Sequence, residues 1–446
     1  MRRLQVQVLI VSSFVFYSFN NPYLVFLLTL SVLINGYVSF KISSSIGKGY
    51  YLALLAVVFN IVVLVFFKYN KLLFLSLSNE SSFFEMVVLL PLPIGISFYT
   101  FQGISLVIDT YLDKSAQKKP AYVGNNLKSH MQNTANYIAF FPQLVAGPIL
   151  KPAFFISQVK SKSIRSIHWV GAFKHIVLGY FLKLVIANNL TLLTESLASP
   201  AVAYYSSIKV FYLTVAYTVQ VFADFAGYSF IAIGVGKLFG YRLLNNFNYP
   251  FISESFNEFW RRWHVTLYSW FNEYIFNPLV LNNRRSGIKG ICLILVFVFT
   301  LSGIWHGATW NYAIWGATHG LLLVLEFLIS HFGLNKKINQ VRLVNITFVF
   351  TLICFVNLIF KFDDLRVVYI TIKAFLLNWS LPLDGYDRGI YILILLFPVF
   401  LYHYFACFSF RRKKVLCQSN FILFGLMIFL IIFNSGSSQA FIYFQF

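Results

Sequence analysis

The chain has 446 residues, of which 59% are hydrophobic and 11% are charged. Soluble domains are typically about 45–50% apolar and about 25% charged, so this composition excludes an ordinary cytosolic enzyme. The 35 Lys and Arg against 14 Asp and Glu give a formal net charge of +21. Because the basic residues gather between apolar runs, we assign this charge to loops beside an anionic lipid bilayer and predict no nucleic acid partner.

Apolar runs of about 17–25 residues are long enough to cross a bilayer as helices. Such runs lie at 23–40, 51–67, 83–106, 166–190, 208–236, 290–306, 308–331, 342–360, 389–409 and 419–434. Shorter runs at 4–19, 131–149 and 265–281 are predicted to be re-entrant or interfacial elements. The sequence therefore predicts an all-α polytopic membrane protein of about 10–12 crossings, folded as one domain over residues 1–446.

Basic segments between the runs predict which loops face the cytoplasm. They include Arg2 and Arg3, and the segments 41–48, 114–128, 151–165, 237–262, 284–289, 336–342 and 411–414. The loops at 20–22, 79–85 and 191–207 are nearly free of Lys and Arg and are assigned to the opposite face. We expect a multi-pass protein of the cytoplasmic (inner) cell membrane, with residues 4–19 retained as an anchor because no small-residue cleavage site follows them.

Polar groups inside apolar runs are candidates for function because they are costly in lipid. Asp224 lies near the centre of such a run, and either a helix-packing hydrogen bond or a role in the site would explain it. The cysteines lack metal-ligand spacing, so no metal site is predicted. They are Cys292, Cys354, Cys407 and Cys417.

The segment 256–276 carries an aromatic stripe at helical spacing, which predicts a helix lying in the membrane interface. The stripe consists of Trp260, Trp263, Leu267, Trp270 and Tyr274. Arg261, His264 and Tyr268 fall on the adjoining face.

His306 lies in the segment 302–311, SGIWHGATWN, which has glycines close on both sides. Gly303 and Gly307 thin the backbone, so we expect a bulky substrate to approach the imidazole there. Burial keeps an imidazole neutral and able to accept a proton. His319 follows 13 positions later, about 140° around one continuous helix, so both histidines could face one site only with a break near Gly307. Asn311 and His319 share a face, and a packing role for His319 stays open.

Several segments together resemble the membrane-bound O-acyltransferase family, in the bacterial branch of alginate O-acetyltransferases and teichoic acid D-alanyl transferases. They are FPQLVAGPI at 141–149, DFAGYS at 224–229, NFNYPF at 246–251, FWRRWH at 259–264, GIWHG at 303–307 and FIYFQF at 441–446. Phe230 stands where alginate-type sequences usually have an acid, which is nearer the alanyl-transferase pattern. The GxSxG, P-loop, HExxH and GxGxxG motifs do not occur, so nucleotide and zinc hydrolysis gain no support.

The resemblance implies a ring of helices around a central funnel, with His306 as the catalytic histidine and His264 as a second histidine near the same tunnel. It also implies an exported SGNH-esterase-like protein that passes the acyl group to a polysaccharide. We predict an O-acetyltransferase that uses acetyl-CoA as its donor substrate and holds no bound cofactor.

In the predicted reaction His306 acts as the general base, and Asn311 or His264 steadies the oxyanion. Further residues are predicted to line the tunnel, namely Trp305, Gly303, Gly307, Asp224 and His319. Arg261 and Arg262 are predicted to attract the anionic donor. Two alternatives stay open: D-alanine transfer from a carrier protein, and a transporter or flippase for a polysaccharide precursor.

Overall fold

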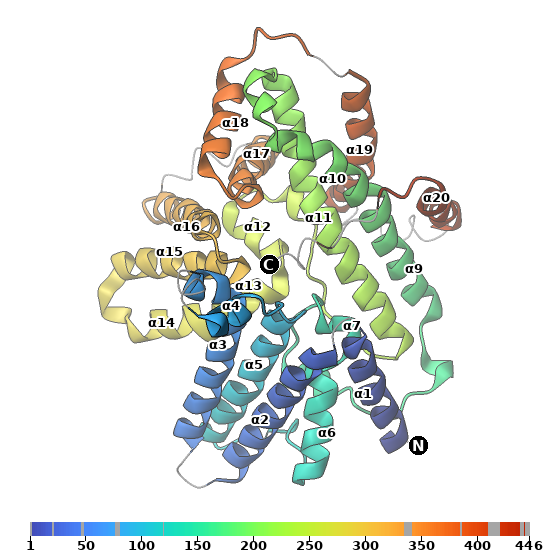
Figure 1. Ribbon diagram of the computed structural model, residues 1–446, viewed down its shortest axis with the longest axis vertical. Coiled ribbons are helices and arrows are strands. Elements are labelled where there is room, and N and C mark those ends of the chain that lie inside the picture. The colour runs from blue at the N-terminus through green and yellow to red at the C-terminus, as the bar shows by residue number, and fades with distance from the viewer. Residues whose placement is uncertain are drawn as a thin grey trace. The chain divides into compact units, whose positions relative to one another are not determined.

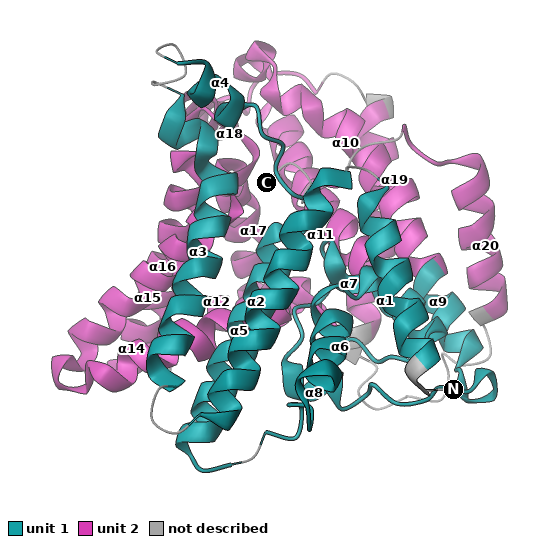
Figure 2. Cartoon of the chain, turned by 60° about the horizontal axis from the view of Figure 1, so that its bottom comes forward, with its two compact units in different colours: residues 1–176, 231–244 teal, residues 177–230, 245–446 magenta. Residues whose placement is uncertain are grey.

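The computed structural model of the protein is helical, with no strand in the residues that it describes (Figure 1). The described residues are 2–19, 22–45, 49–75, 81–118, 120–333, 341–383, 386–408, 420–437 and 441. The contacts divide the chain into two compact units (Figure 2). Unit 1 contains residues 1–176 and 231–244, and unit 2 contains residues 177–230 and 245–446.

Unit 1 is built mainly from the N-terminal helices. They are α1 (Arg2–Ser18), α2 (Val25–Ser44), α3 (Gly49–Phe74), α4 (Ser82–Val88), α5 (Ile96–Ser115), α6 (Leu127–Ile138), α7 (Phe141–Leu144) and α8 (Pro152–Ile156). Two buried asparagines join α2 to α3, since Asn60 Nδ2 donates to Asn35 Oδ1 over 2.8 Å. Such side-chain bonds hold apolar helices together where lipid supplies no hydrophobic drive.

The run at 83–106 does not form one helix, which corrects the sequence prediction. It forms α4 and the first half of α5, separated by residues 89–95. Pro91 and Pro93 lack the amide hydrogens that a continuing helix needs. Gly95 adopts φ +75°, and a Cβ there would lie 2.3 Å from the carbonyl oxygen of Leu144. The chain therefore needs glycine at this turn.

Unit 2 holds most of the remaining helices. Two of its three boundaries with unit 1 fall inside α9 (Trp169–Tyr180) and α11 (Ser207–Leu238), and the third follows Leu244. Its other elements are a π-helical segment (Phe181–Ala187), α10 (Asn188–Thr194), α12 (Phe256–Arg262), α13 (Val265–Phe271), a second π-helical segment (Asn272–Phe276), α14 (Asn277–Asn282), α15 (Gly287–His306), α16 (Trp310–His331), α17 (Arg342–Lys361), α18 (Leu365–Leu377), α19 (Tyr386–Phe408) and α20 (Asn420–Phe433).

Eight helices in the described residues are long and apolar enough to cross a membrane. They are Pro22–Ser44, Gly49–Phe74, Trp169–Ala198, Ser207–Leu238, Arg284–His306, Trp310–His331, Arg342–Lys361 and Arg388–Phe405. The last predicted run, 419–434, yields the 14-residue α20. These spans confirm an all-α polytopic membrane protein. Cys354 is buried and Cys292 half-buried, whereas the side chains of Cys407 and Cys417 lie outside the description.

Candidate active site

The predicted interfacial helix over 256–276 is broken at its centre, which corrects the prediction of one continuous helix. α12 ends at Arg262, Trp263 is extended, and α13 begins at Val265. Between them His264 adopts the left-handed conformation, with φ 43° and ψ 50°. A non-glycine residue in this region is uncommon, and its strain points to a position that the surrounding structure enforces.

The NFNYPF segment at 246–251 supplies the hydrogen bonds that the broken helix lacks. The amide of Asn248 donates to the carbonyl of Arg262, and the amide of Val265 donates to the carbonyl of Asn246, each over 2.9 Å. The hydroxyl of Thr266 donates to Asn246 Oδ1 over 2.6 Å. Two segments that the sequence marked separately thus build one structure around His264. Sequence reasoning missed this pairing because helical periodicity alone continues through 263–264.

The ring of His264 is enclosed by aromatic side chains and is 1% exposed. It meets Phe225 edge-to-face, with ring centroids 4.5 Å apart, and lies 6.4 Å from the indole of Trp305. Burial lowers the pKa of His264 to about 3, because a low-dielectric site disfavours the charged imidazolium. The imidazole is therefore neutral at physiological pH and carries one donor and one acceptor nitrogen.

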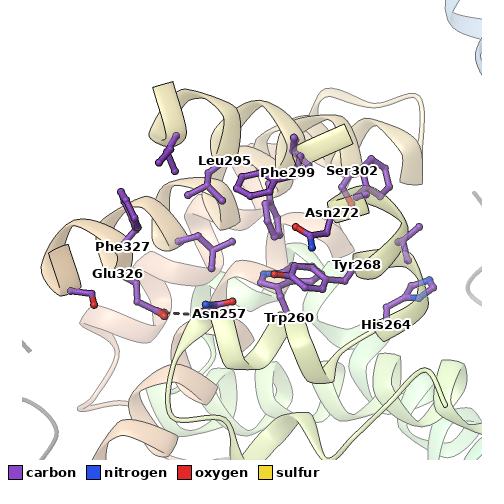
Figure 3. Close-up of a pocket in the computed structure, with 17 residues that line it drawn as sticks. Asn257, Trp260, His264, Tyr268, Asn272, Leu295, Phe299, Ser302, Glu326 and Phe327 are labelled. Carbon is purple, nitrogen blue, oxygen red and sulfur yellow. Dashed lines mark hydrogen bonds between the residues drawn. The ribbon is translucent and has the colours of Figure 1, made fainter. Parts of the chain in front are cut away.

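A cavity of about 400 Å³ reaches His264 (Figure 3). It is enclosed mainly by apolar side chains of α12, α13, α15 and α16, which include Trp260, Leu267, Phe271, Ile291, Leu295, Val298, Phe299, Leu323 and Phe327. Figure 3 shows His264 at one end of this group and Glu326 at the other. Polar atoms come from Tyr268, Asn272 and Ser302. This combination of apolar walls and a few polar groups is typical of a small-molecule site.

Glu326 fixes the start of α12 at the far end of the cavity. Its Oε2 accepts the amide of Phe256 over 2.6 Å and that of Asn257 over 3.2 Å. Ser255 caps the same helix by accepting the amide of Glu258. A carboxylate suits these amides because the helix start is electropositive. The signal for Glu326 was present in the sequence, as an acid within the apolar run 308–331.

The two arginines that were expected to attract the donor differ in their surroundings. Arg262 is held by Glu258, with Nη2 at 2.7 Å, and its Nη1 donates to the carbonyl of Asn248. Arg261 is exposed, and its charge acts on Tyr268 of the cavity wall. Arg262 therefore supports the break at His264, whereas Arg261 is exposed and does not line the cavity.

His306 ends α15, and the chain breaks before α16 begins at Trp310. The ring of His306 is packed against Trp305, Trp315 and Phe360, with ring centroids 4.8, 5.3 and 5.3 Å away. His306 is 4% exposed and is not among the residues that line the cavity. The two candidate histidines are thus linked through Trp305, which contacts both.

The glycines beside His306 bring helices together in this structure. A Cβ on Gly303 would lie 2.1 Å from the carbonyl oxygen of Tyr312, and one on Gly316 would lie 2.2 Å from that of Phe299. A Cβ on Gly307 would meet the ring of Tyr312 at 2.2 Å. Atoms of α15 and α16 therefore lie where the side chains of larger residues would stand, and the close approach serves the packing of α15 on α16.

Asn311 and His319 lie on α16, and neither lines the cavity. The Nδ2 of Asn311 donates to the carbonyl of Phe362, which ties α16 to the end of α17. The ring of His319 is 1% exposed and lies edge-on to Trp260 and Trp315, with ring centroids 4.9 and 4.8 Å away. Its position behind the cavity wall matches the packing role that the sequence left open.

Asp224 has a charged partner within the same unit. Lys183, in the π-helical segment, donates to Asp224 Oδ1 over 2.5 Å, and both side chains are buried. The ammonium also lies over the ring of Phe441, 4.3 Å from its centroid. This ion pair gives Asp224 a structural explanation next to Phe225, which contacts His264. Residues 442–446 of the C-terminal motif lie outside the described residues.

Comparison of the sequence with known proteins identifies the family of this chain. The model of the membrane-bound O-acyltransferase family matches residues 8–362, which include both candidate histidines. The chain belongs to this family. The fold class, the membrane location and the resemblance drawn from the motifs are thereby confirmed.

Members of the membrane-bound O-acyltransferase family with curated names are similar to this chain over much of its length. A probable alginate O-acetylase of Pseudomonas aeruginosa is 31% identical over 81% of this chain and 68% of that protein. A peptidoglycan O-acetyltransferase of Helicobacter pylori is 34% identical over 72% and 64%. A teichoic acid D-alanyltransferase of Bacillus subtilis is 28% identical over 55% and 60%. The matches thus span about two thirds or less of each relative.

Proposed function

We propose that this protein is a membrane O-acetyltransferase that moves an acetyl group from a thioester donor toward a hydroxyl of a cell-envelope polysaccharide. The observation that carries the proposal is the apolar cavity that ends at the buried, neutral His264. Relatives named as acetylases support the acetyl group. The family assignment favours acyl transfer over transport of a polysaccharide precursor.

The shape of the cavity suits a thin, flexible thioester arm. It follows α15 from Ile291 to Ser302, a rise of about 16 Å at 1.5 Å per residue. The Ile291 end lies next to the exposed basic residues Arg284, Arg285 and Lys289, which the sequence predicts to be cytoplasmic. An anionic donor such as acetyl-CoA would be attracted to this end. Its acyl group would then enter between apolar walls that exclude water.

Acyl transfer requires one group that accepts a proton and one that stabilises the carbonyl oxygen. The cavity reaches His264 but not His306, so the proposed step also requires that Trp305, which contacts both rings, moves aside. In that step the acceptor hydroxyl gives its proton to His306 and its oxygen attacks the thioester carbonyl carbon. The C–S bond breaks, the acetyl group stays on the oxygen, and the leaving thiolate takes the proton from the imidazolium. His264, neutral because it is buried, donates a hydrogen bond to the carbonyl oxygen as negative charge develops there.

We propose that the acceptor hydroxyl reaches the site from the extracytoplasmic face, and that an exported SGNH-esterase-like protein delivers the acetyl group to the polymer. The similarity to a D-alanyltransferase leaves one other donor open, namely a carrier protein that bears a D-alanyl group. The two donors differ in their acyl amine, so they can be offered separately to the same purified protein.

The test measures thiol release from acetyl-CoA by the full chain in lipid nanodiscs with a hydroxyl acceptor. We expect His264→Ala to lower the rate about 10²–10³-fold by loss of an oxyanion donor, and His306→Ala about 10²–10⁴-fold by loss of the base. His331→Ala, at the exposed end of α16, serves as the control and should keep the wild-type rate. Full activity of His264→Ala, or turnover with the D-alanyl carrier alone, would contradict the proposal.

A further inference from the structure

The indole of Trp305 contacts one histidine inside the cavity and one outside it. Its ring centroid lies 6.4 Å from that of His264, which lines the cavity, and 4.8 Å from that of His306, which does not. Trp305 is 6% exposed and is not itself among the residues that line the cavity. A buried aromatic side chain thus separates the closed end of the cavity from the proposed base.

The spacing along α15 places Trp305 on the same face of the helix as the cavity wall. Residues of α15 that line the cavity recur at intervals of three or four, the spacing of one helix face (Figure 3). They include Ile291, Leu295, Val298 and Ser302. Trp305 follows Ser302 by three positions, so it is the next side chain of this face toward the end of α15. The wall therefore changes from a small serine to a bulky indole where the cavity stops.

Other aromatic side chains occupy the space around the two histidines. Phe225 meets His264 with ring centroids 4.5 Å apart, and Trp315 and Phe360 each meet His306 at 5.3 Å. Packed protein interiors leave few voids, so these contacts leave little room for a ligand. The volume of the Trp305 side chain is therefore the space through which the cavity can extend to His306 when the indole turns away.

We propose that Trp305 determines the length of the acyl group that this enzyme transfers. The inference rests on the proposed function, in which the thioester carbonyl meets His306 after Trp305 moves aside. The acyl group and the attacking hydroxyl then share the volume that one indole leaves, which suits a two-carbon group. Each further methylene would have to displace the aromatic neighbours, and insertion of extra methylenes into a packed interior is unfavourable.

The first test measures binding without turnover, by isothermal titration calorimetry of the full chain in lipid nanodiscs. The probes are S-ethyl-CoA and S-hexyl-CoA, thioethers that lack the reactive carbonyl. The wild type should bind S-hexyl-CoA no more tightly than S-ethyl-CoA. Each methylene that becomes buried contributes roughly fourfold in affinity. Trp305→Ala should therefore bind S-hexyl-CoA about 16-fold more tightly than S-ethyl-CoA if the lost indole makes room for two methylenes.

The second test compares thiol release from acetyl-CoA and hexanoyl-CoA with the same hydroxyl acceptor. Methylenes that do not fit an apolar pocket reduce kcat/KM steeply, so the wild type should prefer acetyl-CoA by about 10²-fold or more. In Trp305→Ala we expect this ratio to fall below about tenfold. Trp305→Phe keeps a ring in the packed site and should give an intermediate ratio, which tests the proposal even if Trp305→Ala does not fold. The ratio compares two donors on one protein, so a general loss of activity does not change it.

Trp315→Ala is the matched control, because it removes another buried indole that packs against His306. Trp315 belongs to α16 and does not lie on the cavity face of α15. This variant should lower the rate with both donors and keep the wild-type preference for acetyl-CoA.

Two results overturn the proposal while acetyl transfer by the wild type still supports the proposed function. One is an unchanged preference in both Trp305 variants, and the other is an equal gain of hexanoyl transfer in Trp315→Ala. Tighter binding of S-hexyl-CoA than of S-ethyl-CoA by the wild type would also overturn it, since the longer chain would then fit beside the indole. A wild type that binds neither thioether would contradict the CoA donor of the proposed function and this inference together.

Discussion

Removal of the hydrogen bond from Thr266 to Asn246 tests which contacts hold the break at His264 in place. Both side chains are buried, and the bond is 2.6 Å long. Asn246→Ala removes the acceptor but leaves the backbone carbonyl that accepts the amide of Val265. Loss of one partner of a buried hydrogen bond costs about 1–3 kcal/mol. We therefore expect the free energy of unfolding to fall by that amount.

The same substitution should also lower the activity of the protein that remains folded. A displacement of about 1 Å at a reacting group can cost 10²-fold in rate, and Asn246 is bonded to the two residues that follow His264. Thiol release from acetyl-CoA, measured well below the unfolding temperature, separates this effect from loss of folded protein. We expect a rate reduction of roughly ten- to hundredfold.

Asn248→Ala is the matched control within the same segment. The two bonds of Asn248 to Arg262 use its backbone amide and its backbone carbonyl, so truncation of the side chain keeps both. Its side chain is exposed, and the substitution should change stability by less than about 0.5 kcal/mol. If Asn246→Ala and Asn248→Ala reduce activity equally, or if neither does, the pairing of 246–248 with 262–266 does not position His264.

Three more predictions concern packing, charge and pH. Gly303→Ala should reduce the yield of folded protein, because its Cβ would overlap a backbone carbonyl of α16. The control Gly425→Ala in α20 should not, because nothing lies within 4 Å of the added Cβ. Size-exclusion profiles of the two variants measure the yield of folded protein. Asp224→Asn should destabilise by about 3–5 kcal/mol in thermal unfolding, because the charge of Lys183 stays buried, and replacing both residues by apolar ones should restore stability. Burial lowers the pKa of His130 to about 4, so the unfolded state binds more protons and stability should fall as pH drops from about 6.5 toward 4; in His130→Gln this slope should be smaller.

Much of the fold followed from the sequence because lipid imposes a simple requirement. A run of apolar residues must form a helix that satisfies its own backbone, so most predicted runs coincide with observed spans. The prediction of one helix over 83–106 was wrong because hydropathy carries no information about where a proline removes an amide hydrogen. Pro91 and Pro93 mark the break in the sequence itself, since neither residue has the amide hydrogen of a continuing helix.

The candidate site was predicted less completely, since it depends on contacts between distant segments. The sequence identified His264 and His306 but assigned the glycines near His306 to substrate access, whereas Gly303 faces the backbone of α16. Local spacing cannot distinguish these roles, because a missing side chain serves a ligand and a neighbouring helix alike. Glu326 was overlooked for a similar reason, as its partners lie about 70 positions earlier in the chain.

The backbone at His264 also bears on how the cavity works. Left-handed conformations cost about 1–3 kcal/mol at a non-glycine residue and persist only where other contacts impose them. Tyr249, which directly follows the paired residues 246–248, has φ 50° as well. Both strained residues thus flank the same set of hydrogen bonds, formed by Asn246 and Asn248. A ring held by such a structure has little freedom to turn. The end of the cavity is therefore rigid, and the selection of a short acyl group would rest on fixed walls at His264 more than on adjustment of its side chain.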